Sequence, residues 1–393
     1  MRYIKFLAKA IVSLLMVVLL AIVMTSFSLV YNFQKPTPFS GNDIFNPYRN
    51  LDTAHCWKRA NFHTHTRVDG LLNECNYTPE QTLEFYDQLG YDIVTFSNHN
   101  ALTSHPTDSS LQVNLYEHGY NLCKFHKLVF GSSRVWHFDN LLPIFTSQKQ
   151  FQIEQLKQQG DIIVLNHPLR TNSLSNNQLE KIGGYNIIEL DSGKSTENSY
   201  WDAALSAGRY SFGIANDDLH HPDRTRAIAI RCNLLCTPTA EYNDICTTLL
   251  DGCYYSMRVP DYGDGDWEQK RGQNRHLPYI RNIGLNNNNI FITLSEAADS
   301  IKVTGQGHRT LAVAYNTDTL GYAMAPTESY GRFTAYFADG EVIYSNPFAR
   351  YDSNSSDSPF STTYSINILL TVLYNLIVAL LAALLVYKTI KLW

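Results

Sequence analysis

The chain lacks charge in two long stretches, and these absences define its ends. Residues 10–34 contain no Asp, Glu, Lys or Arg, and neither do residues 358–387. Each stretch is apolar and long enough to cross a bilayer as a helix. Basic residues flank their outer ends: Arg2, Lys5 and Lys9 before the first, Lys388 and Lys391 after the second. Because basic flanks stay in the cytoplasm, we predict two spans of the cytoplasmic (inner) membrane, cytoplasmic termini and an extracytoplasmic, periplasmic middle.

Other structures remain possible for both apolar stretches. A cleaved signal peptide is the alternative for the first, although its apolar run exceeds a usual signal core and no clean A-x-A site follows. Cleavage would leave the location of the middle unchanged. A buried helix of a soluble core is the alternative for the second stretch.

The middle of the chain lacks a long basic run, and the net charge of the 393 residues is −5. We therefore expect no nucleic-acid partner. No C-x-x-C occurs among the seven cysteines, so a zinc knuckle is not indicated. Cys232 with Cys236, or Cys246 with Cys253, could form a disulfide in an oxidising compartment, and the odd count leaves at least one thiol unpaired.

Composition and turn residues divide the chain into six segments. We expect a membrane anchor at 1–34, a Pro-containing linker at 35–57, an α/β domain at 58–283, a small antiparallel β-sandwich-like module at 284–351, a polar linker at 352–363 and a transmembrane helix at 364–388.

Short apolar runs alternate with helical patterns through the α/β domain. The stretch "TPEQTLEFYDQLG" has Thr78 as a helix cap, Pro79 at the first helical position, Gln81 three residues after the cap and Gly90 as a stop. Strands alternating with helices predict a parallel sheet with crossover helices, here of a barrel type.

Histidines and acids follow the predicted strands. They are His63, His65 and Asp69, then His99, His137 and His167, and finally Asp217, Asp218 and His220. In a strand, residues two apart share a face, so His63 and His65 can address one point. An isolated H-x-H is otherwise an ordinary surface strand. The strand ends of an α/β barrel open onto one face, so we expect these side chains to converge, and this mixture of imidazoles and carboxylates suits a metal.

The order H-x-H, D-G, N-H-N, H-P and D-x-H resembles the PHP (polymerase and histidinol phosphatase) superfamily over about residues 58–225. The resemblance implies a distorted (β/α)7 barrel holding one to three divalent ions, zinc, manganese or iron. Carried over residue by residue, His63, His65 and Asp218 hold the first ion, His137 and His167 the second, and Asp69, His99 and His220 the third.

The same resemblance implies a hydrolase in which the metal ions activate a water. We assign Asp69, Arg170 and Asp218 to the catalytic set. The expected substrate is a small-molecule phosphoester, with a carboxyl or carbamate ester as the second possibility. Other basic candidates for binding an anionic substrate are Arg67, Lys194 and Arg224.

Two positions depart from the family pattern. Asn98 stands where the family has an aspartate, and Ser132 or Ser133 stands where a glutamate usually bridges two metals. Glu189 or Asp139 could compensate. These departures leave open a catalytically degenerate PHP-like protein that binds a ligand or metal as a sensor or scaffold.

Overall fold

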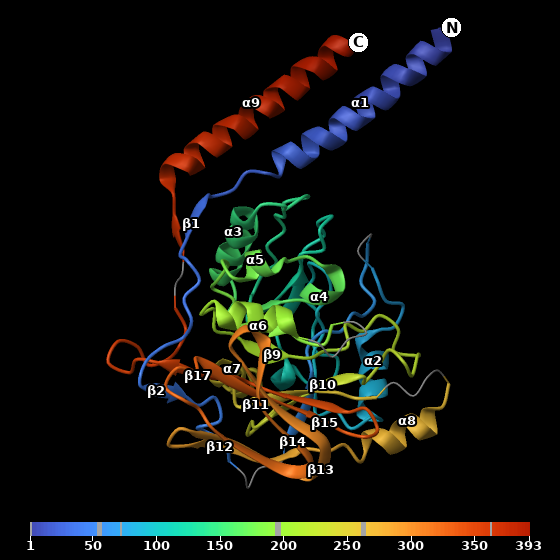
Figure 1. Ribbon diagram of the computed structural model, residues 1–393. Helices are drawn as coiled ribbons and strands as arrows, with labels where there is room; N and C mark the ends of the chain where they lie inside the picture. The colour runs from blue at the N-terminus through green and yellow to red at the C-terminus, as the bar shows by residue number, and fades with distance from the viewer. Residues whose placement is uncertain (1, 53–56, 71–72, 193–197, 261–264, 362–363) are drawn as a thin grey trace.

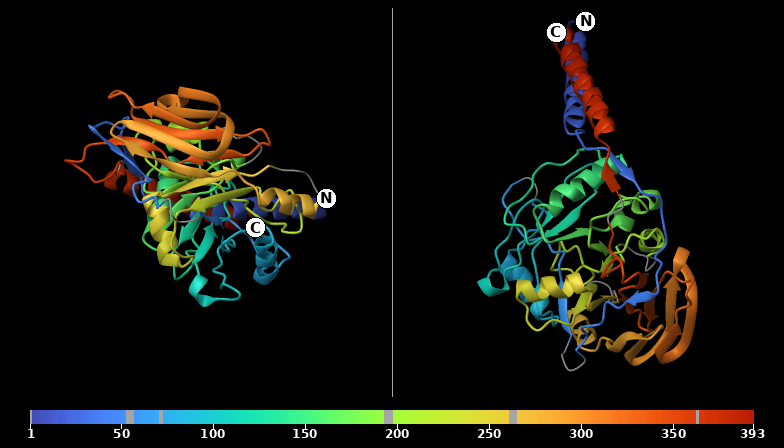
Figure 2. Two further views of the ribbon diagram at one scale, coloured as in Figure 1. Left: turned by 90° about the horizontal axis from the view of Figure 1, so that it is seen from below. Right: turned by 90° about the vertical axis from the view of Figure 1, so that its left-hand side faces the viewer.

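A mixed α/β body carries two long helices that project from it (Figure 1). The computed structural model describes residues 2–52, 57–70, 73–192, 198–260, 265–361 and 364–393. The two helices leave one end of the body, and strands β12 to β15 lie at the opposite end, as the right-hand view of Figure 2 also shows.

The projecting helices are α1 (Arg2–Met24) and α9 (Ile368–Leu392). They pack side by side in opposite chain directions, so both termini lie at the end far from the body (Figures 1 and 2). At their base, β1 (Tyr31–Phe33) pairs antiparallel with β18 (Tyr364–Ile366). Mean hydropathy over the most apolar window is 2.8 in Tyr3–Met24 and 2.6 in Ile368–Leu392. By length and composition, each helix could cross a membrane.

The larger sheet has eleven strands and runs through both predicted domains. Its main path is β12-β13-β15-β16-β11-β10-β3-β4, with β14 beside β13 and with β17 joining β15 to β2. The bounds are β2 Asp43–Phe45, β3 Lys58–Asn61, β4 Ile93–Val94, β10 Arg231–Leu235, β11 Tyr254–Arg258, β12 Ile280–Asn286, β13 Asn289–Gly305, β14 Arg309–Ala323, β15 Tyr330–Tyr336, β16 Val342–Ser345 and β17 Phe348–Tyr351. Strands β12 to β17 pair antiparallel, as expected for the C-terminal module. The pairing of β16 with β11 makes the module's sheet continuous with the preceding domain.

The second sheet has five strands in the order β5-β6-β7-β8-β9. These are β5 Leu115–His118, β6 Lys127–Phe130, β7 Ile162–Leu165, β8 Ile187–Glu189 and β9 Phe212–Ile214. Only the pairs β7–β8 and β8–β9 are parallel in this sheet, whereas β5–β6 and β6–β7 are antiparallel. The predicted parallel pairing is therefore present from β7 to β9, and the prediction is wrong for β5 and β6.

The two sheets are not closed into one barrel, so the predicted (β/α)7 barrel is not confirmed. The sheets meet at two places. Where β4 of the larger sheet approaches β5 of the second sheet, β4 is two residues long and the backbone link is an isolated bridge between His99 and Glu117. Where β9 approaches β10, the Asn233 side chain accepts a hydrogen bond from the Ala215 amide and donates one to the Ala215 carbonyl, each 2.9 Å long. A side chain thus satisfies backbone groups that a neighbouring strand would satisfy in a closed barrel.

Shorter helices follow or precede the strands of the body. They are α2 Pro79–Asp87, α3 Thr146–Lys157, α4 Pro168–Thr171, α5 Asn176–Leu179, α6 Ser199–Ser206, α7 Tyr242–Asp251 and α8 Trp267–Asn274, with 3-10 turns η1 Ser109–Leu111 and η2 Gln306–His308. The predicted capping box of α2 is confirmed: Thr78 accepts from the Gln81 amide, and the Gln81 side chain accepts from the Thr78 amide.

Neither predicted disulfide is present, because Cys232, Cys246 and Cys253 are free thiols. Cys253 lies instead beside Cys236, the next position along the β10–β11 ladder, where the Cys236 amide donates to the Cys253 carbonyl.

Candidate metal centre

Two isolated backbone bridges bring the histidine-bearing segments together. Beyond the end of β3, Thr64 pairs with Leu219, and the His65 amide donates to the Leu219 carbonyl at 2.8 Å. This pairing places the H-x-H segment beside Asp218. The second bridge, between His99 and Glu117, adds the segments after β4 and in β5.

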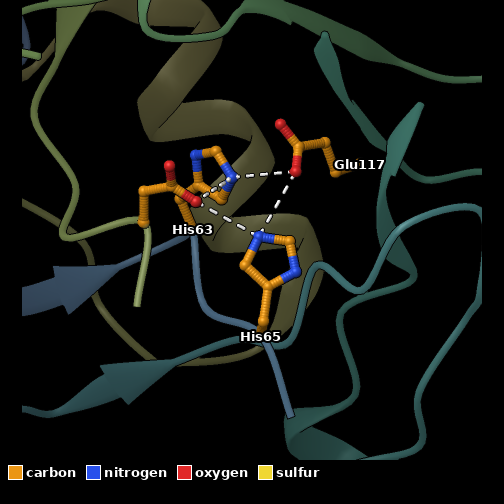
Figure 3. A group of neighbouring side chains, drawn as sticks. His63, His65 and Glu117 are labelled. Carbon is orange, nitrogen blue, oxygen red and sulfur yellow. Dashed lines mark hydrogen bonds and ion pairs between the residues drawn. The ribbon is translucent and has the colours of Figure 1, made fainter. Parts of the chain in front are cut away.

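The first group consists of His63, His65, Glu117 and Asp218, whose ligand atoms lie within 4.8 Å of one another. The Nε2 atom of His63 is 3.2 Å from Glu117 Oε2 and 3.0 Å from Asp218 Oδ1. The Nε2 atom of His65 is 3.2 Å from the same Asp218 oxygen. Figure 3 shows both imidazoles and the Glu117 carboxylate facing a common centre. Two imidazoles and two carboxylates form a donor set that zinc, iron and manganese accept.

Glu117 is the centre of the whole cluster because its two oxygens face different histidines. Oε2 lies 3.0 Å from His99 Nε2, in addition to its contacts with the H-x-H pair. Oε1 lies 3.2 Å from His126 Nδ1 and 3.2 Å from His167 Nε2, and accepts a hydrogen bond from Asn166. A carboxylate in this arrangement can bridge two ions, one at each oxygen.

Glu74 supplies a further carboxylate on the cavity side. Its Oε2 atom lies 3.1 Å from His99 Nε2 and 3.4 Å from His220 Nε2. Hydrogen bonds from His220 and His99 hold the pKa of the Glu74 carboxyl well below its usual range. Glu74, His65 and His99 form another group whose ligand atoms lie within 4.8 Å of one another.

Hydrogen-bond acceptors beside the Nδ1 atoms orient two of the imidazoles, so that their Nε2 atoms face the centre of the cluster. Glu189 lies 3.0 Å from His63 Nδ1 and accepts a hydrogen bond from the His167 amide at 2.7 Å. The Nδ1 atom of His220 is 2.8 Å from the Asp218 carbonyl oxygen and can donate to it. When Nδ1 carries the proton in this way, Nε2 is left as the lone-pair donor, which is how ligand histidines are usually prepared for a metal.

The electrostatics of the cluster also fit a cation. Burial alone would lower the pKa of His63, but Glu117 and Glu189 outweigh it and raise that pKa to about 9. Burial lowers the pKa of His65 to about 4. Burial also opposes ionisation of Glu189, yet the contact with His63 lowers the pKa of this acid to about 2. The buried Nε2 of His63 has no hydrogen bond within the described ranges despite its two close carboxylates, so a metal ion would satisfy it.

Three residues in or next to the cluster have a strained backbone conformation. His167 has φ 29° and Asp218 has φ 51°, and Asn100, next to His99, has φ 48°. Positive φ is costly for residues other than glycine and persists where the surrounding structure enforces it, often at functional sites.

A cavity of about 930 Å³ opens onto the cluster and is lined by His99, Glu117, His167, Asp218 and Arg170, among others. The Arg170 side chain is 42% exposed, and its guanidinium forms an ion pair with Asp218. Arg170 is thus the predicted basic residue that lies at the cluster. Arg67 and Arg224 are exposed and do not line this cavity, and Lys194 lies outside the described residues.

The structure gathers most of the predicted site residues and leaves out two. The gathered ones are His63, His65, His99, His167, Asp218 and His220. Asp69 and His137 are exposed and belong to none of the metal-compatible groups among the described residues. Glu74 lies where the Asp69 carboxylate was expected, beside His99 and His220. His126 lies where His137 was expected, because it immediately precedes β6.

Ser132 and Asn98, which depart from the family pattern, and Asp139, proposed as a substitute for the bridging acid, have other roles. Ser132 donates to the Arg134 carbonyl, and Asp139 accepts from the Tyr120 amide and from Gln152. Asn98 accepts from the Thr66 amide at 2.7 Å, so it fastens the segment after the H-x-H pair.

The sequence reasoning missed Glu117 because it missed strand β5. All four residues of "LYEH" are buried, so the strand shows no apolar–polar alternation. The available signal was an acid just ahead of Gly119, between the N-H-N motif and the next apolar run.

Replacing Glu189 by glutamine should weaken metal binding without removing a ligand. The charge that holds the Nδ1 proton of His63 is lost, and we expect metal affinity to fall roughly 10- to 100-fold. Competition with a chromophoric chelator measures this change. The control is Glu268→Gln, an exposed acid on α8. Equal affinities for the two variants would contradict the orienting role of Glu189.

No protein-family model and no curated protein sequence matches the chain. Among solved structures, the chain is similar to a two-domain protein from Bacteroides vulgatus ATCC 8482, described as containing a predicted PHP-like metal-dependent phosphoesterase. The identity is 14%, the alignment covers 80% of this chain and 100% of the other, and the TM-score is 0.38. With so loose an overlap, the geometry of the cluster itself is what bears on function.

Proposed function

We propose that this protein is a membrane-anchored, metal-dependent hydrolase of the PHP type that cleaves phosphoesters. The observation that carries the proposal is the position of Glu117, a buried carboxylate with imidazoles around both of its oxygens. Together with Asp218 and Glu74, this set offers ligands for more than one divalent ion, of which zinc, manganese and iron are the candidates.

The chain's own groups would bind and orient the substrate. Divalent ions in such a cluster supply Lewis acidity, which activates a water and stabilises negative charge on a phosphoryl oxygen. Arg170 stands at the cavity wall with a planar guanidinium suited to two phosphate oxygens. Its ion pair with Asp218 holds it at the cluster. The buried floor, which includes His63 and Glu189, keeps the ligands rigid.

A sensor or scaffold that binds without turnover is the competing function. It was suggested by Asn98 and by the serine in place of a bridging glutamate, whereas Glu117 supplies a carboxylate between the imidazoles and so favours the hydrolase. Asn98 departs from the family pattern, yet its side chain is engaged in fastening Thr66.

The membrane part of the proposal rests on α1 and α9. Neither helix is packed into the body, since none of the most apolar window of α1 and only 11% of that of α9 is buried. A soluble protein seldom exposes such apolar surface. Both termini lie at the same end of the helix pair (Figure 1), so the basic flanks could both face the cytoplasm and leave the body on the other side.

His63→Ala tests the proposal. The full chain, purified in detergent, should hold roughly two or more ions, as two-metal hydrolytic sites do, and should hydrolyse p-nitrophenyl phosphate or a related diester. The variant should lose metal and activity together, measured by elemental analysis and release of nitrophenol. His276→Ala, at an exposed histidine, is the control. At most one ion in the parent chain, with no hydrolysis across a broad ester panel, would support the binding protein instead.

A further inference from the structure

The loop that precedes α3 is fastened to the base of the projecting helices. Asn140 donates to the Thr25 carbonyl, and the Leu141 amide donates to the Thr25 hydroxyl at 3.1 Å. The Tyr31 amide donates to the Ser147 hydroxyl at 3.1 Å. Residues 140–147 are therefore held directly under α1, at the end of the body that faces the two helices (Figure 1).

The tip of this loop contacts α9 within its apolar length. The ring of Phe145 meets that of Tyr374 edge-on, with centroids 6.4 Å apart, and Gln148 donates to the Tyr374 hydroxyl. Tyr374 lies six residues beyond the start of α9, which is about 9 Å along the helix at 1.5 Å per residue. If α9 spans a bilayer, Phe145 and its neighbour Ile144 lie at the depth where the bilayer begins.

Exposed apolar side chains gather at this loop. Ile144 and Phe145 are each 54% exposed, and Leu122, which lines the same cavity as Ile144, is 70% exposed. We call these three residues the apolar rim. Single exposed apolar residues are common, but a cluster beside a membrane helix is typical of a surface that meets lipid.

The cavity joins the apolar rim to the metal cluster. Its wall includes Ile144 and Leu122 of the rim as well as Glu117 and His167 of the cluster. Three basic side chains, Lys124, Lys149 and Arg170, also line it. The cavity therefore offers cations for a phosphate group and an apolar edge for hydrocarbon.

We propose that the substrate is a membrane lipid with a phosphoester in its headgroup. The inference rests on the proposed hydrolase function and names its substrate class. The acyl chains stay in the bilayer beside the apolar rim, and the headgroup enters the cavity. Water adds to phosphorus, the bond from phosphorus to the leaving oxygen breaks, and the leaving alcohol takes up a proton, so that no other reactant is consumed.

The depth of the rim is tested without any catalysis. Ile144→Trp in the full chain, placed in nanodiscs, should lose fluorescence when brominated lipids replace ordinary ones, relative to the parent chain. Tyr279→Trp is the control, because Tyr279 is 46% exposed and directly precedes β12, at the opposite end of the body (Figure 1). Equal quenching of the two added tryptophans would overturn the placement and with it the inference.

The substrate class is tested by comparing two esters. We measure kcat/KM for phosphatidic acid in nanodiscs and for water-soluble p-nitrophenyl phosphate. The triple variant Leu122→Ser, Ile144→Ser, Phe145→Ser should lower the ratio of lipid to soluble activity about tenfold or more, since apolar contact with the lipid is lost. Leu250→Ser, an exposed leucine on α7, should leave the ratio unchanged.

The outcomes separate the two proposals. Hydrolysis of the soluble ester without hydrolysis of phosphatidic acid, or of phosphatidylglycerol supplied in the same nanodiscs as a second lipid, overturns the lipid inference and leaves the hydrolase function standing. An unchanged ratio in the triple variant also overturns the inference. Hydrolysis of neither class by the metal-loaded parent overturns both.

Discussion

Glu117→Gln should abolish hydrolysis and remove bound metal. The glutamine keeps the size of the side chain but lacks the negative charge that bound cations need, at a position surrounded by five imidazoles, those of His63, His65, His99, His126 and His167. Loss of a ligand's outer partner already costs roughly 10- to 100-fold, and loss of a shared ligand should cost more. Elemental analysis and the rate of p-nitrophenyl phosphate hydrolysis measure both effects.

The matched control for Glu117→Gln is Glu296→Gln, at an exposed position on β13. It should change neither metal content nor rate. A Glu117→Gln protein that retains its full complement of metal would show that this carboxylate bridges nothing, and the centre would then have to be built from Asp218 and Glu74.

Arg332→Met should destabilise the fold by about 3–5 kcal/mol, the usual cost of leaving a buried charge without its partner. Arg332 lies on β15 and donates to both oxygens of Asp202 on α6, with Nε–Oδ1 at 2.9 Å. The guanidinium also stacks 5.0 Å from the Trp201 ring. Both charged residues are buried, so this pair fastens the C-terminal strands to the preceding domain. Urea unfolding of the full chain in detergent measures the loss.

An exposed arginine provides the comparison for Arg332. Arg309→Met, on β14, which pairs with the far side of β13, should change stability by less than about 0.5 kcal/mol. Adding Asp202→Asn to Arg332→Met should recover part of the loss, because the buried carboxylate that has lost its guanidinium partner no longer carries a charge. Equal stability of Arg332→Met and Arg309→Met would mean that the pair does not hold the two parts together.

The stabilisation by the Asp202–Arg332 pair also depends on pH. Burial opposes ionisation of Asp202, but Arg332 and His308 hold its pKa below the ordinary 3.8. Because the pKa of Asp202 is lower in the folded state than in the unfolded state, the ionised carboxylate stabilises the fold fully at pH values above its ordinary pKa. This stabilisation is lost as the pH falls through the lower, folded-state pKa. The difference in stability between parent and Arg332→Met should therefore shrink in strong acid.

Local sequence patterns determined the two projecting helices, the start of α2 and the convergence of the histidines. The uncharged stretches became α1 and α9, and the capping residues Thr78 and Gln81 began α2 where expected. Histidines at strand ends also converged, because a strand that ends at the rim of a sheet delivers its next residues there whatever the details of pairing. His63, His99 and His167 show this directly.

Tertiary structure decided which acids complete the site. Glu117 lies in a strand with every side chain buried, so no periodicity marks it. Glu74 reaches the cluster through a loop, and loop geometry does not follow from residue order. The same limit explains why His126 rather than His137 joins the cluster. Short strands also left the two sheets joined by single bridges and by Asn233, because pairing partners form only when distant segments meet. Motif order is a property of the chain, whereas the distance between side chains is a property of the fold.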